Sequence, residues 1–163
     1  MTKEKKQEFT LRITQANRTQ LTVILYEMAL YYVDEAQLAG EGLPENKEKK
    51  EAYRTAIRKA RNCVKELQST LNYDYPISGN LLSLYVYANR ELTRADVARK
   101  PAYLENVKRV LSSLHDAFAR VSEEDDSEAI MENTQTVYAG LTYGKDSLNE
   151  NLADQGGSRG FFV

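Results

Sequence analysis

The sequence is poor in the residues that most often bind metals or carry catalysis. Its 163 residues include one cysteine, one histidine and no tryptophan. The lone Cys63 excludes an intramolecular disulfide and fits a reducing cytoplasm. His115 alone cannot supply the two Glu-x-x-His pairs of a di-iron bundle, and no glycine-rich phosphate loop or metal-ligand spacing occurs. Because Cys63 lies between apolar positions of a helical pattern, we interpret it as a buried side chain rather than a nucleophile activated by His115. We therefore expect no cofactor, no metal site and no enzymatic activity.

Long apolar runs and a strong net charge are also missing. No stretch approaches the roughly 18 uninterrupted apolar residues of a membrane span, and residues 1–7 are mostly charged and polar. These features predict a cytoplasmic protein without a signal peptide or membrane insertion. The formal net charge of −2 argues against a nucleic-acid binder, which is usually basic.

What the chain does contain is apolar residues at helical spacing. The first such segment begins at Asn17, where Gln20 completes a capping box, and proline or glycine residues separate the segments that follow. The four segments span approximately residues 17–39, 45–71, 76–97 and 102–121. Helices of this length with short connections predict an all-α fold, an antiparallel up-down four-helix bundle with an extended C-terminal tail. We expect an N-terminal arm at 1–16, the bundle at 17–121 and the tail at 122–163.

The third segment has more apolar surface than one buried stripe requires. At residues 80–90, Leu81, Leu84, Tyr85 and Ala88 form one stripe, which we expect to face inward, and Leu82, Val86 and Tyr87 add apolar surface beside it. Two explanations remain open. Either this helix occupies a crowded position in the bundle, or its second face borders a groove for a partner.

The tail has a different composition from the bundle. Residues 122–163 contain nine acidic and two basic residues, a net charge of −7, so residues 1–121 carry +5. Such acidic segments are often solvated and disordered. Apolar residues nevertheless occur within this one, at Val137, Tyr138 and Leu141.

Three segments resemble the FliS family of flagellin-specific export chaperones. The entry to the first long helix is similar at residues 13–16 with Leu21 and 25–27, and so is the second helix at 56–71. The most specific match is Asn80-Leu81 followed by Leu84-Tyr85 and Tyr87, which resembles an Asn-Leu-x-x-Leu-Tyr-x-Tyr signature. Val86 stands where the family often has an acidic residue. The resemblance covers roughly residues 9–121 and does not explain the tail.

The resemblance implies a specific function. Proteins similar to this one bind the C-terminal helical region of flagellin, prevent its premature polymerisation and help to deliver it to the flagellar type III export gate. This is helix-in-groove recognition. On this interpretation the candidate groove residues are Tyr26, Ile57, Asn80, Leu81, Leu84, Tyr85, Tyr87 and Arg90.

The empty groove would expose apolar surface, so segments of the chain itself are candidates to occupy it. The expected self-occupying residues are Phe9, Leu11 and Ile13 in the arm, or Val137, Tyr138 and Leu141 in the tail. The alternative function is a helical-bundle adaptor or self-associating module unrelated to flagella. The sequence leaves the oligomeric state open.

Overall fold

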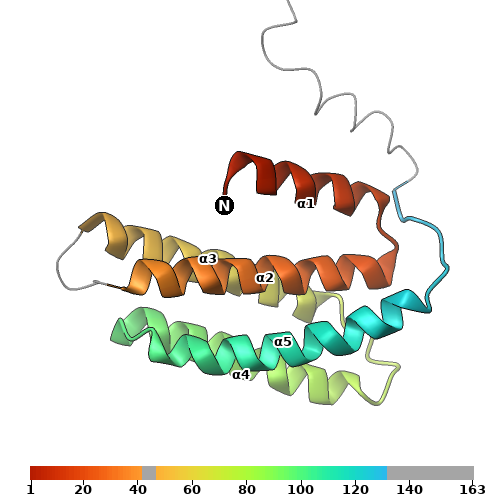
Figure 1. Ribbon diagram of the computed structural model, residues 1–163. Coiled ribbons are helices and arrows are strands. Elements are labelled where there is room, and N and C mark those ends of the chain that lie inside the picture. The colour runs from red at the N-terminus through yellow and green to blue at the C-terminus, as the bar shows by residue number, and fades with distance from the viewer. Residues whose placement is uncertain (42–46, 132–163) are drawn as a thin grey trace, which may run out of the picture. The chain divides into compact units, whose positions relative to one another are not determined.

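A computed structural model describes residues 1–41 and 47–131, and every regular element in these ranges is a helix. Five helices follow one another along the chain (Figure 1). They are α1 (Lys3–Gln15), α2 (Arg18–Gly40), α3 (Lys47–Ser69), α4 (Ser78–Ala98) and α5 (Ala102–Glu123). The predicted all-α class is confirmed, but the helix count for the described part of the chain is five, not four.

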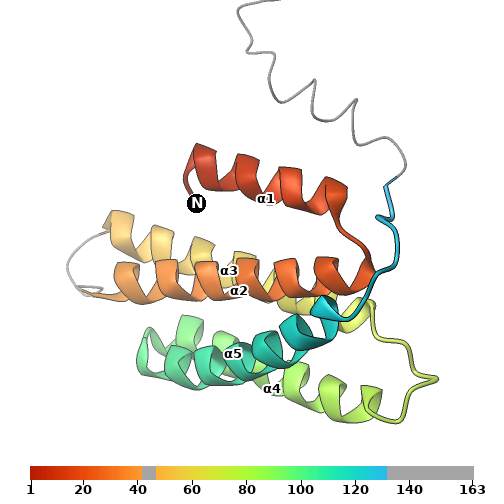
Figure 2. The ribbon, with the colours of Figure 1, turned by 45° about the vertical axis from the view of Figure 1, so that its right-hand side comes forward.

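Helices α2 to α5 pack in a ring. Helix α2 contacts α3 and α5, and α4 contacts the same two helices from the opposite corner. Consecutive helices run in opposite directions, and α1 lies along α2 on the outside of the ring (Figures 1 and 2). The ring therefore leaves α2 and α4 facing each other across its diagonal.

Local signals explain several helix boundaries. Asn17 caps α2 with the predicted capping box, because its side chain accepts from the amide of Gln20 while the Gln20 side chain accepts from the amide of Asn17. At the other end of α2, a Cβ on Gly40 would lie 2.5 Å from Cγ of Pro101, so only glycine permits this close approach to the start of α5. Helix α4 ends at Ala98, and the capping residue Arg99 has a positive φ of 52° before Lys100-Pro101.

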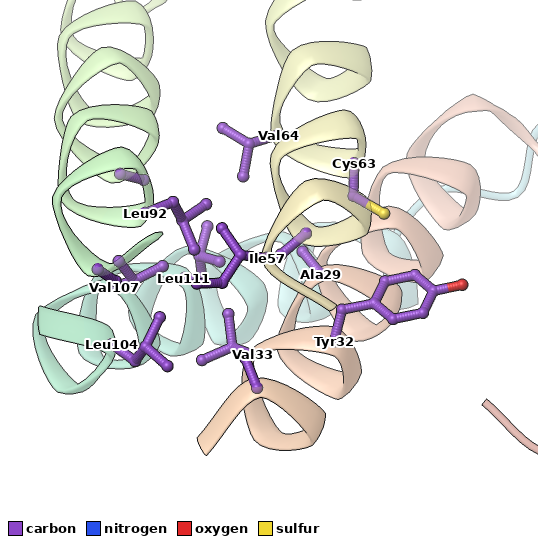
Figure 3. Packing of buried hydrophobic residues seen from close by; sticks show 14 of the residues in the cluster. Ala29, Tyr32, Val33, Ile57, Cys63, Val64, Leu92, Leu104, Val107 and Leu111 are labelled. Atoms are coloured by element: carbon purple, nitrogen blue, oxygen red, sulfur yellow. The ribbon is translucent and has the colours of Figure 1, made fainter. Parts of the chain in front are cut away.

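The core lies inside the ring. Figure 3 shows side chains from α2, α3, α4 and α5 converging there, among them Val33, Ile57, Leu92 and Leu111. Each of these four is no more than 1% exposed. Burial of this kind is the main favourable contribution to folding.

Helix α1 lies within residues 1–16, where the sequence predicts an N-terminal arm but no helix. Residues 3–8 are Lys, Glu and Gln, which have good helix propensity but give no apolar periodicity. The apolar residues of α1 are Phe9, Leu11 and Ile13, of which only Phe9 and Ile13 are four residues apart, and Ala16 follows just after the helix. Phe9 and Ala16 pack with Ile24 of α2 in a separate small cluster. This short stripe was too weak to predict a helix by periodicity.

Candidate functional site

One end of the ring contains an apolar groove with a volume of about 630 Å³. Helix α2 forms one wall, and the end of α3 with the loop before α4 forms the other. Helices α1, α4 and α5 and the chain after α5 complete the lining. The apolar residues of this lining are Ile13, Leu21, Ile24, Leu25, Leu67, Leu71, Ile77, Leu81, Phe118 and Ile130, joined by Tyr75 and Tyr85.

The floor of the groove is an aromatic cluster that crosses the ring. Tyr85 of α4 lines the groove, and its hydroxyl is hydrogen-bonded to that of Tyr26 on α2. The Tyr26 ring also lies 5.5 Å from the ring of Phe118, centroid to centroid. Burial raises the pKa of both tyrosines above the usual value. The hydroxyl pair therefore stays neutral and ties α2 to α4 across the diagonal.

The predicted groove residues separate into four groups. Leu81 and Tyr85 line the groove, at 7% and 1% exposure. Tyr26 lies behind the lining as the partner of Tyr85. Ile57 is packed in the core of the ring and is not part of the groove lining (Figure 3).

Four other predicted residues lie on a different side of α4. Asn80 and Arg90 are exposed, and Leu84 is 37% exposed. Tyr87 is half-buried, and the guanidinium of Arg90 lies over its ring, 5.3 Å from the centroid of the Tyr87 ring. None of them lines the groove. The expectation that Leu84 points inward was wrong: the inward face of α4 takes Leu81, Tyr85 and Ala88, and position 84 falls at its edge.

The candidate self-occupying residues of α1 have different surroundings. Ile13 forms part of its lining, Phe9 is buried against α2, and Leu11 is half-buried. Arg12 holds α1 in place through two hydrogen bonds from its guanidinium to the Glu27 carboxylate, one of them 2.8 Å long. Burial opposes ionisation of Glu27, but the hydrogen bonds and charge of Arg12 outweigh it and lower the pKa of the carboxyl. Val137, Tyr138 and Leu141 lie outside the described residues.

The five helices, and all of the groove lining except Ile130, fall inside the region of the chain that matches a known family. Residues 1–125 match the family model described as "Flagellar protein FliS". The chain belongs to the FliS family. The match spans all five helices and confirms the family that the resemblance over residues 9–121 indicated. A search of curated proteins finds no match. FliS proteins are chaperones of flagellar export.

Several residues of the FliS groove were absent from the predicted site. Leu21, Leu25 and Leu71 are half-buried, so each offers apolar surface to the groove while packing against its neighbours. In the sequence they are ordinary members of helical stripes. Only the tertiary arrangement distinguishes a residue at the open end of the ring from one in its centre.

In the described part of this FliS chain, neither Cys63 nor His115 lies in the groove. Cys63 is buried, and the burial raises the pKa of its thiol to about 11, which suppresses thiolate chemistry. His115 contacts the carboxylates of Glu27 and Asp116 at 3.8 and 3.0 Å. Among residues 1–41 and 47–131, no cluster of three potential metal ligands occurs. No helix in these ranges is long and apolar enough to cross a membrane.

Proposed function

We propose that this chain is a cytoplasmic export chaperone that binds the C-terminal helical region of flagellin in the groove. It thereby prevents premature polymerisation and aids delivery to the flagellar type III secretion apparatus. The observation that supports the proposal is the groove itself, an apolar channel at the open end of the ring in a member of the FliS family.

The chemistry of the lining fits an amphipathic helix. Leucine and isoleucine side chains from α2, α3 and α4 offer apolar contacts to client residues spaced three and four apart. Thr22, Thr70 and Asn72 add polar groups to the lining, and Arg18 is its one charged residue within the described chain. A client helix that buries its apolar face here would leave its polar face toward solvent.

The residues take different roles in this proposal. Leu81 and Tyr85 contact the client, and Tyr26 holds Tyr85 in position. Ile57 supports the ring from within the core. Asn80, Leu84, Tyr87 and Arg90 would meet only a client segment that continues past the groove onto the outer side of α4. A partly unfolded client can wrap such a long surface, which offsets the cost of ordering it.

The test is to mix the full chain with a flagellin C-terminal segment and measure complex mass by size exclusion with light scattering. We expect a 1:1 complex. A charge placed in the groove by Leu71→Asp should abolish it, because the carboxylate would lose its hydration when the client binds. Leu38→Asp is the matched control: Leu38 is 67% exposed near the end of α2 and is not part of the lining.

Circular dichroism of both variants verifies that each remains helical. Failure of the unaltered chain to bind flagellin would refute the proposal. Self-association of the chain in the same experiment would instead favour the self-associating module.

A further inference from the structure

The chain that follows α5 is hydrogen-bonded to the helices. Residues 124–131, here called the strap, run from the end of α5 to the junction of α1 and α2 (Figures 1 and 2). Four hydrogen bonds hold the strap at this junction. The Asn17 side chain donates to two strap carbonyls, the Thr19 hydroxyl donates to the Asp125 carboxylate, and the Ile130 amide donates to the Ala16 carbonyl.

Asn17 is the central residue of this attachment. Its amide nitrogen Nδ2 donates to the carbonyls of Asp125 and Ser127, at 2.9 and 3.2 Å, while its Oδ1 caps α2 at Gln20. The side chain is 2% exposed, so these bonds replace the water contacts that it has lost. Serine or aspartate would cap the helix equally well. Only an amide both caps α2 and donates twice to the strap.

The strap brings an apolar side chain to the groove. Ile130 lines the groove together with α2 and the end of α3. It does so although more than one hundred residues separate it in the sequence from Leu25, the last α2 residue of the lining. Ile130 is still 54% exposed, and the groove retains its volume of about 630 Å³ with the strap in place. The strap therefore extends the wall of the groove and does not fill it.

We propose that the strap is a wall of the client-binding groove, fastened by Asn17, and that Ile130 contacts the apolar face of the bound flagellin helix. This inference rests on the proposed function. It also extends the proposed binding site beyond the residues that match the family model, because the match ends at residue 125, before Ser127 and Ile130. Contact with the client would bury the exposed half of the Ile130 side chain, which favours binding.

The experiment uses the full chain and a flagellin C-terminal segment in calorimetric titrations. Ile130→Ser should weaken affinity about 5- to 10-fold, since it removes most of one partly exposed apolar contact. Met131→Ser is the matched control, because Met131 is 48% exposed on the same strap and does not line the groove. Its affinity should stay within about 2-fold of the unaltered chain.

Asn17→Ser tests the fastening separately. It keeps a helix cap but removes the donor to the strap, so the Ile130 amide should lose its protection in hydrogen exchange. Affinity should fall about as far as in Ile130→Ser, and the double variant should fall no further, since both changes remove the same wall.

The outcomes are distinguishable. Unchanged or tighter binding by Ile130→Ser, while the unaltered chain binds normally, overturns the strap inference alone; tighter binding would make the strap a competitor of the client. Retained protection of the Ile130 amide in Asn17→Ser also overturns it. Absence of binding by the unaltered chain overturns both this inference and the proposed function.

Discussion

The two sides of α4 have similar compositions and opposite environments. On the side facing the groove, Leu81 and Tyr85 are 7% and 1% exposed. On the other side Leu84 is 37% exposed and Tyr87 is half-buried. A leucine and a second apolar residue occur on each side, so residue type does not set the difference. The neighbouring groups set it. The side that faces the groove is surrounded by α3, the loop before α4 and the Tyr26 hydroxyl. On the outer side, the Arg90 side chain lies over Tyr87.

The comparison shows why apolar surface alone does not identify a binding site. The groove is apolar and also concave, because side chains from all five helices and from the strap line it, whereas the outer side of α4 is the surface of one helix. A concave lining can surround a client side chain and exclude water from it, which is where binding energy concentrates.

The largest expected difference between the two sides is in stability. Tyr85→Ala removes a fully buried ring and leaves the Tyr26 hydroxyl without its partner, so it should lower the free energy of unfolding by about 4 kcal/mol. Leu84→Ala should lower it by less than about 1 kcal/mol, because the side chain is already partly in water. Urea unfolding followed by circular dichroism measures both. Equal losses would mean that the two sides of α4 are not distinct.

A smaller difference concerns the tyrosine hydroxyls. Tyr85→Phe keeps the ring but leaves the Tyr26 hydroxyl without a hydrogen-bond partner, which should lower the free energy of unfolding by about 1–3 kcal/mol. The double change Tyr26→Phe/Tyr85→Phe should lower it by less than the two single changes together. Tyr87→Phe, on the outer side, should cost less than about 0.5 kcal/mol. Additive losses for Tyr26 and Tyr85 would argue against a coupled hydroxyl pair.

The same pair should respond to alkaline pH. Burial raises the pKa of Tyr26 and Tyr85 in the folded protein, so their contribution to stability is complete below the ordinary tyrosine pKa of about 10 and is lost as pH rises above it. The unaltered chain should therefore lose stability between about pH 10 and 11 more steeply than the double phenylalanine variant. Identical pH profiles in urea unfolding would contradict this.

The helices of the ring could be predicted from the sequence because their signals are local. The Asn17 capping box, the prolines between segments and the apolar stripes all act within a few residues, and α2 to α5 begin and end close to the predicted positions. Helix α1 has only Phe9 and Ile13 as apolar residues at helical spacing, and it depends on packing against α2, which lies beyond the reach of a periodicity argument.

The groove was predictable only in part, for a related reason. Leu81 and Tyr85 carry the family signature, so the resemblance placed them. Leu71 and Ile130 carry no such signature, and they reach the groove because the end of α3 and the strap meet there. The same resemblance placed Tyr87 and Arg90 with Leu81, yet a helix turns residues of one short segment to different sides, and neither of the two lines the groove.

The smallest expected effect is on the outer side of α4. Arg90→Ala removes the guanidinium that lies over the Tyr87 ring, a partly solvated contact worth about 0.5–1 kcal/mol. If the client continues past the groove, its affinity should fall about 2- to 3-fold, and the loss should shrink at high salt because an exposed charge is screened. Arg58→Ala, an exposed arginine on α3 outside the groove lining, is the control and should leave affinity unchanged. Equal affinity in both variants would argue against a flagellin contact at Arg90.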